Sequence, residues 1–129
     1  EITADRILMW NEYHASCLPL RSKGHVQLPR IPEGIFQNAH LYFVLAKNLD
    51  ERTDLLKHLN DDGISAVHHY VPLHDSPAGL RFGRAYDALP NTDKVADTIV
   101  RLPLWSGMDI RDVKTVVSSL NSFYGELNE

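Results

Sequence analysis

The stretch HLYFVLAKNLDERTDLLKHLNDDGISAVHHYV, residues 40–71, decides the fold because it predicts a strand, a helix and a second strand in succession. The segment HLYFVLA (40–46) is almost continuously apolar, as in a strand that is covered on both faces. The helix is expected to begin at Asp50 as its N-cap and to end at Gly63, a residue that readily adopts a left-handed conformation. The segment ISAVHHYV (64–71) predicts the second strand, which ends at the proline that follows it.

Towards the N-terminus, the segment EITADRILMWNEYHASC (1–17) predicts a helix from its first residues. Its apolar side chains recur at spacings of three, three and four, which places them on one face: Ile7, Trp10, Tyr13 and Cys17. The helix is expected to end near Pro19, since proline disfavours helical geometry in the preceding residue. Prolines and glycines then make residues 19–39 an irregular connector. A large apolar face with no cap before it suggests a chain cut from something longer.

Towards the C-terminus, the sequence predicts a short helix over residues 93–98, capped by Asn91 or Thr92, and a third strand, IVRLPL, over 99–104. Asp109 is expected to cap a last helix, whose inward face is formed by Ile110, Val113, Val117 and Leu120. The predicted fold class is therefore an α/β (α+β) two-layer sandwich, with a small sheet of about three strands and helices on one side.

The bulk composition is that of a single globular domain. The chain has 129 residues, of which 43% are hydrophobic and 23% charged. A net charge of −4 without a basic cluster argues against nucleic-acid binding, and no apolar run reaches the roughly 18 residues needed to cross a bilayer. A single cysteine, Cys17, excludes an internal disulfide and fits a reducing compartment, so we expect a cytoplasmic protein.

Residues that could bind a ligand or take part in catalysis are concentrated in HHYVPLHDSPAG (68–79). This stretch runs into a segment, 72–90, that is expected to be a long loop. A metal site is one interpretation. Adjacent histidines on a strand point to opposite faces, so the remaining set would be His69, His74 and Asp75. That set matches no standard ligand spacing and has no thiolate support, and we therefore expect no metal.

A self-contained catalytic site is a second interpretation, and the sequence argues against it. Ser76, His74 and Asp75 lie too close together on one loop to form a triad, and no GxSxG turn is present. The segment has no phosphate-binding loop. None of the five lysines has the setting of a Schiff-base lysine: Lys23, Lys47, Lys57, Lys94 and Lys114. We expect no catalytic residue in this chain.

A third interpretation is a binding site that another domain or chain completes. Tyr70 and His74 lie where a strand gives way to a turn stiffened by proline, and both side chains can hydrogen-bond hydroxyls or phosphates. Arg81 and Arg84 can pair with a phosphate, or they can simply form a solvated face. Two alternatives stay open: a free-standing module that uses residues 68–75 to bind a metal or an anion, and a structural domain that dimerises through its first helix.

The segments HYVPLHDSPAGLRFG (69–83) and LPNTDKVADTIVRLPLWSGMDIRDVKTVVSSL (89–120) resemble the C-terminal part of the DegT/DnrJ/EryC1/StrS family of pyridoxal-phosphate-dependent sugar aminotransferases. RILMWNEYHASC (6–17) is similar to the family's long helix that leads into the small domain, and PEGIFQNAHLYFVL (32–45) to its first small-domain strand. Within the family, FQNAHLYFVL and VHHYVPLHDSPAG most resemble the dTDP-4-amino-4,6-dideoxygalactose transaminases.

The resemblance implies that the chain is the small C-terminal domain of a fold-type-I aminotransferase, with an interdomain helix (1–18), a connector (19–39) and a sheet-and-helix body (40–129). The family's large N-terminal domain, with its cofactor lysine, would be the missing partner in a homodimeric parent. The parent would use pyridoxal phosphate to move an amino group from glutamate to a nucleotide-linked keto-sugar. This chain alone would bind no cofactor and would be inactive.

The resemblance and the position of the loop also select the residues expected to bind substrate. His74 is the first candidate for a contact to the sugar or the diphosphate, and Tyr70 is the second. Asn38 and His40, at the entry to the first strand, are weaker candidates, and Arg81 is a candidate for the phosphate.

Overall fold

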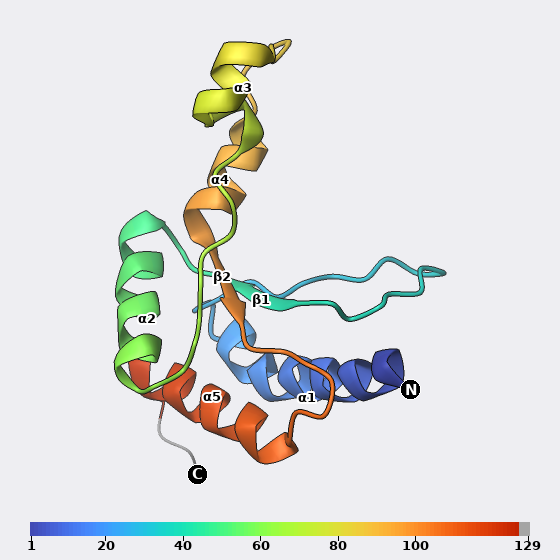
Figure 1. Cartoon of the computed structure of the whole chain (residues 1–129). Coiled ribbons are helices and arrows are strands. Elements are labelled where there is room, and N and C mark those ends of the chain that lie inside the picture. The colour runs from blue at the N-terminus through green and yellow to red at the C-terminus, as the bar shows by residue number, and fades with distance from the viewer. Residues whose placement is uncertain (127–129) are drawn as a thin grey trace.

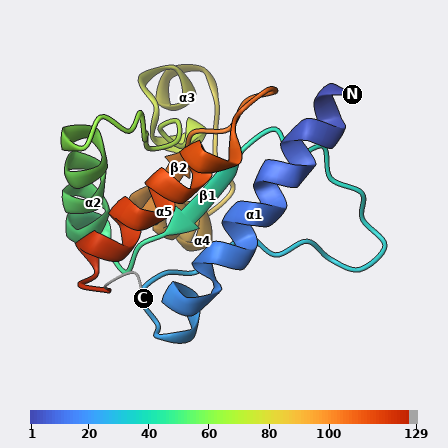
Figure 2. The same cartoon turned by 90° about the horizontal axis from the view of Figure 1, so that it is seen from below.

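The computed structural model describes residues 1–126 and is an α+β domain around a two-stranded sheet (Figure 1). The elements in chain order are α1 (Ile2–Ser22), β1 (Tyr42–Leu45), α2 (Leu49–Asp61), the 3₁₀-helix η1 (Leu73–Asp75), α3 (Pro77–Phe82), α4 (Pro90–Thr98), β2 (Ile99–Leu102) and α5 (Ile110–Phe123). α1 and α5 pack beside each other against one face of the sheet, and α2 packs against α5 (Figures 1 and 2). No helix within residues 1–126 combines the length and the apolar character that crossing a bilayer requires. The predicted fold class is confirmed.

The sheet consists of β1 and β2 in antiparallel register, with Tyr42 opposite Leu102. Both strands were predicted from the sequence. The strand expected over 64–71 is not formed, and only a single bridge joins Val67 to Arg101. Past this bridge the side chains of the segment are mostly exposed, so no buried face holds it against the sheet.

Helix α1 presents the predicted apolar face to the core, but the expected end near Pro19 is wrong. The helix continues to Ser22 with Pro19 inside it. Proline removes one backbone hydrogen bond, yet Leu20 in the following turn is buried, and the backbone N–H of Lys23 donates to the Pro19 carbonyl at 3.0 Å. Burial of this last turn outweighs the local cost of the proline.

A stack of aromatic rings fixes α1 to the sheet. The rings of Tyr13 and Tyr42 lie parallel, with their centroids 5.1 Å apart. Trp10 meets the edge of Tyr42 at 5.3 Å and stacks on His14 at 4.9 Å. The hydroxyl of Tyr13 donates to the carbonyl of Pro103 at 2.9 Å, just beyond β2. The ring stack (Trp10, Tyr13, His14 and Tyr42) therefore joins the first helix to both strands.

Helices α2 and α5 are each capped by a side chain at the N-terminus, and one of the two caps was predicted from the sequence. In α5, Asp109 and Asp112 form the reciprocal hydrogen bonds of a capping box, which confirms the cap predicted at Asp109. In α2 the cap is Asn48, whose side chain accepts from the backbone N–H of Glu51 at 2.9 Å. The expected cap, Asp50, lies inside the first turn, because the helix begins at Leu49, two residues earlier than a cap at Asp50 would place it.

Residues 67–97, which we call the arm, project from the side of the sheet opposite α1 and α5 (Figure 1). None of these residues is buried. The expected loop over 72–90 contains η1 and α3, and α4 begins at Pro90, so Asn91 and Thr92 lie within the helix rather than capping it. The arm carries exposed apolar side chains along its whole length: Val67, Tyr70, Val71, Leu73, Leu80, Phe82, Tyr86, Leu89 and Val95.

Candidate functional site

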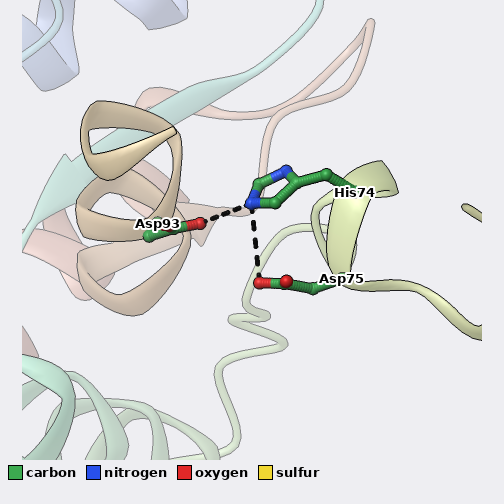
Figure 3. Close-up of side chains that lie close together, drawn as sticks. All are labelled: His74, Asp75 and Asp93. Atoms are coloured by element: carbon green, nitrogen blue, oxygen red, sulfur yellow. Dashed lines mark hydrogen bonds and ion pairs between the residues drawn. The ribbon is translucent and has the colours of Figure 1, made fainter. Parts of the chain in front are cut away.

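His74 is the centre of the candidate site and joins two parts of the arm (Figure 3). Its Nε2 lies 2.8 Å from Oδ1 of Asp93, in the first turn of α4, and 3.6 Å from Oδ2 of the neighbouring Asp75. The side chain of His74 is 16% exposed. Because a carboxylate can only accept, the ring carries a proton on Nε2 and donates it to Asp93. Nδ1 faces away from both carboxylates and has no hydrogen-bond partner among residues 1–126, so in the tautomer with one proton on Nε2 it can accept a hydrogen bond from a ligand.

The local sequence explains why η1 turns here. The hydroxyl of Ser76 donates to the Leu73 carbonyl and accepts from the backbone N–H of Gly79, each at 2.9 Å. Pro77 occupies the first position of α3, where its missing N–H costs nothing. A Cβ on Gly79 would lie 1.6 Å from the Leu73 carbonyl oxygen, so only glycine permits this approach of α3 to η1. These contacts hold the turn that presents His74.

Two adjoining cavities flank the site. One, of about 660 Å³, is lined by His74, by Arg84 and mainly by apolar side chains of α3 and the loop after it. The other, of about 460 Å³, is lined by Tyr70 and His69. Thr92 lines both cavities, so the structure brings Tyr70 and His74 to the same region of the arm. Mostly apolar walls with a few polar groups are the usual character of a small-molecule site.

Two further polar groups lie in this region: Asp93, which was not predicted as a site residue, and His69, which was considered only as a metal ligand. Asp93 lies 19 residues beyond His74, at the start of the helix predicted over residues 93–98. His69 has a buried Nδ1 without a hydrogen-bond partner among the described residues, and its ring contacts Tyr70 at 5.0 Å. A buried nitrogen without a partner favours a ligand that can satisfy it.

Arg81 is placed less favourably than Arg84 for binding an anion in the cavity beside His74. The Arg81 guanidinium lies over the ring of the adjacent Phe82, 4.9 Å from its centroid, and does not line the cavity beside His74. Arg84 does line that cavity and is exposed. Within residues 1–126 neither arginine forms an ion pair with a carboxylate, so both are free to meet an anion.

Asn38 and His40 lie apart from this region. Asn38 lies at the end of the connector (19–39) and His40 directly follows it, and the connector extends away from the arm in both views (Figures 1 and 2). The Asn38 side-chain oxygen accepts from the His40 backbone N–H at 3.2 Å and lies 3.0 Å from His40 Nδ1. Ala39 between them has a φ of 47°, in the left-handed region. The two side chains therefore stabilise a turn and do not meet His74.

The described residues do not fit a covalent pyridoxal phosphate site. Such a site needs a lysine that is enclosed and readily deprotonated. All five lysines are exposed, and a hydrogen bond to Asp61 raises the pKa of Lys57. Cys17 is no alternative nucleophile, because burial raises its pKa to about 12.

The fold and the site together define a small α+β domain whose projecting arm carries mainly apolar cavities with a few polar groups. Comparison with known proteins gives its family. Residues 1–121 match the sequence model of the DegT/DnrJ/EryC1/StrS aminotransferase family. A curated relative, the pleiotropic regulatory protein of Geobacillus stearothermophilus, is 28% identical over 100 residues, which cover 77% of this chain and 26% of the relative.

Solved structures show the same fold. DesV of S. venezuelae, in complex with a ketimine intermediate, superposes with a TM-score of 0.85 at 23% identity, over 98% of this chain and 33% of that one. NtdA of Bacillus subtilis, with bound cofactor PMP, superposes with a TM-score of 0.82 at 22% identity, over 97% of this chain and 29% of the NtdA chain. The chain belongs to the DegT/DnrJ/EryC1/StrS aminotransferase family. It spans about a third or less of the length of these relatives.

Proposed function

We propose that this chain is the C-terminal small domain of a pyridoxal-phosphate-dependent sugar-nucleotide aminotransferase. One observation carries the proposal: the family match extends over residues 1–121, while the superposition on DesV includes 98% of this chain and only 33% of the DesV chain. The partner would be an N-terminal large domain of the same polypeptide, in a homodimeric cytoplasmic enzyme. The chain alone would be inactive.

The proposed reaction moves an amino group from glutamate to a dTDP-4-keto-6-deoxy sugar. Support for this sugar comes from FQNAHLYFVL and VHHYVPLHDSPAG, which resemble the dTDP-4-amino-4,6-dideoxygalactose transaminases. The product would enter surface polysaccharide of the enterobacterial common antigen type. Pyridoxal phosphate, bound elsewhere in the parent, would supply the electron sink for this transfer.

The role of this chain would be to form one side of the substrate-binding cleft. His74, oriented by Asp93, would accept a hydroxyl hydrogen bond through Nδ1, and Tyr70 would donate its phenol to a sugar or phosphate oxygen. Arg81, or Arg84 on the cavity wall, would pair with the diphosphate. Asn38 and His40 are weaker candidates, because they lie on a separate loop.

The test is a His74→Ala variant of the full-length protein. Turnover of the nucleotide sugar should fall at least about tenfold, as expected for a lost hydrogen bond worth about 1.5 kcal/mol. The imine absorbance of the cofactor should be retained, since the lysine lies elsewhere. His68→Ala is the matched control: His68 is an exposed histidine of the arm, and it should leave turnover unchanged. Normal turnover in His74→Ala would exclude the role proposed for His74.

The sugar specificity has its own test. Full-length enzyme is offered a panel of keto-sugars that differ in nucleotide base and in configuration. The highest kcat/KM is expected for the dTDP-4-keto-6-deoxy substrate. A clear preference for another sugar would overturn this part of the proposal and leave the family assignment intact.

A further inference from the structure

The carboxylates beside His74 form a donor cluster that the proposed function leaves unused. The three side chains His74, Asp75 and Asp93 come from η1 and α4, and one ligand atom from each lies within 4.8 Å of the other two. Both carboxylates approach the same nitrogen, Nε2, rather than opposite edges of the ring (Figure 3). The substrate contact proposed above uses Nδ1 and does not occupy this side.

The local charge favours a cation. Among the described residues neither Asp75 nor Asp93 forms an ion pair with a lysine or an arginine; their only basic partner is the imidazole of His74. The two carboxylates outnumber the single imidazole, so the cluster carries net negative charge and attracts a cation. Their side chains are 61% and 44% exposed, so an ion can reach them from solvent.

The geometry suits a first-row transition metal. Tetrahedral zinc with bonds of about 2.1 Å holds neighbouring ligand atoms about 3.4 Å apart. The two distances here, 2.8 Å and 3.6 Å, bracket that separation, and the half-exposed carboxylates can adjust by the few tenths of an ångström required. An imidazole nitrogen in the donor set disfavours magnesium and calcium, which prefer oxygen.

We propose that His74, Asp75 and Asp93 bind one divalent transition-metal ion, of which Zn²⁺ is the best match. The sequence argued against a metal because His69, His74 and Asp75 have no recognised spacing. The structure replaces His69 by Asp93, which no spacing rule connects to the loop. The ion would bind Nε2 while the ring proton moves to Nδ1, would leave a fourth position for water and would fasten η1 to α4. In this metal-bound form Nδ1 would donate a hydrogen bond to a sugar oxygen instead of accepting one from a hydroxyl.

The test is a calorimetric titration of the 129-residue chain with ZnCl₂, without sugar or cofactor. One ion per chain is expected. Asp75→Asn and Asp93→Asn should each weaken binding at least about tenfold, because each removes an anionic ligand. The control is Asp54→Asn, which removes the same charge from an exposed residue of α2 and should leave the affinity unchanged.

A second readout keeps the test decisive if a variant is less stable. Zn²⁺ should raise the Tm of the unaltered chain and of Asp54→Asn, and should raise it far less in Asp93→Asn. Absence of 1:1 binding, or equal affinity in Asp93→Asn, would overturn the metal site. Because the assay contains neither sugar nor cofactor, that outcome would leave the aminotransferase proposal untouched.

Discussion

The hydroxyl of Tyr13 joins parts of the chain that lie 90 residues apart. Its ring has no exposed surface and stacks on Tyr42, while its hydroxyl donates to the carbonyl of Pro103. Burial raises the pKa of this phenol above its usual value, so the donor stays protonated. The same residue thus serves the apolar core and satisfies a backbone carbonyl at the end of β2.

Tyr13→Phe keeps the ring and removes only this hydrogen bond. The free energy of unfolding should fall by about 1–2 kcal/mol, because the Pro103 carbonyl is left without its partner in a half-buried position. Urea denaturation followed by circular dichroism measures the change. Tyr86→Phe is the control, since Tyr86 is 100% exposed, and it should be neutral. Equal stability of both variants would contradict the assigned role.

Single residues of the site were predicted unevenly. His74 and Tyr70 were found because prolines and histidines cluster there, and the structure places them beside adjoining cavities. Asp93 was missed, because its link to His74 exists only once α4 folds back against η1. Asn38 and His40 were chosen for their position before a strand, and their hydrogen bonds within one turn are not visible in residue types.

Among the elements, those with a buried face were predictable. Helix α5 has an apolar periodicity that matches its burial. Strands β1 and β2 are short, mainly apolar runs, although in β1 only alternate residues are fully buried and not both faces as expected. The expected strand over 64–71 failed because its valines and tyrosine are exposed, so residue type alone misled. Helix α3 was missed although Ser76 and Pro77 carry a helix-start signal; the glycines that follow favoured a loop.

The cap of α5 gives a pH prediction. Hydrogen bonds from the Arg111 side chain, then from its backbone N–H, lower the pKa of Asp109 to about 2. A carboxyl whose pKa is depressed in the folded state contributes stability above its unfolded pKa, near 3.8, and loses this contribution as pH falls through about 2. The native chain should therefore lose stability between pH 4 and pH 2 through this residue.

Asp109→Asn isolates this effect, because asparagine still caps the helix but does not titrate. The native chain should be the more stable of the two above pH 4, and the difference should shrink as the pH falls towards 2. Urea unfolding of both proteins at a series of pH values measures it. A difference that does not change with pH would show that the ion pair with Arg111 adds nothing to the folded state.

The described residues, 1–126, divide into the arm, which contains no buried residue, and the rest, here called the body, which contains all the buried ones. The sequence predicted the body, because apolar periodicity reports burial within one chain. It could not predict the arm, whose apolar side chains have nothing in residues 1–126 to cover them. Local stability should follow this division.

Hydrogen exchange should make the division measurable. Amides of α3 should exchange orders of magnitude faster than amides of α5 and β1, because few buried contacts break when α3 opens. Mass spectrometry of peptides from residues 77–82 and 110–123 provides the comparison. Similar protection in the two regions would mean that the arm unfolds only together with the body.

The ring stack has a practical consequence for spectroscopy. The two tryptophans occupy opposite environments: Trp10 is 6% exposed against Tyr42 and His14, and Trp105 is 48% exposed. A buried indole emits at a shorter wavelength than a solvent-exposed indole, and it is shielded from the quencher acrylamide. The fluorescence of the two tryptophans can therefore be separated by quenching. The Trp10 signal then reports, without any added label, whether the first helix still lies against the strands.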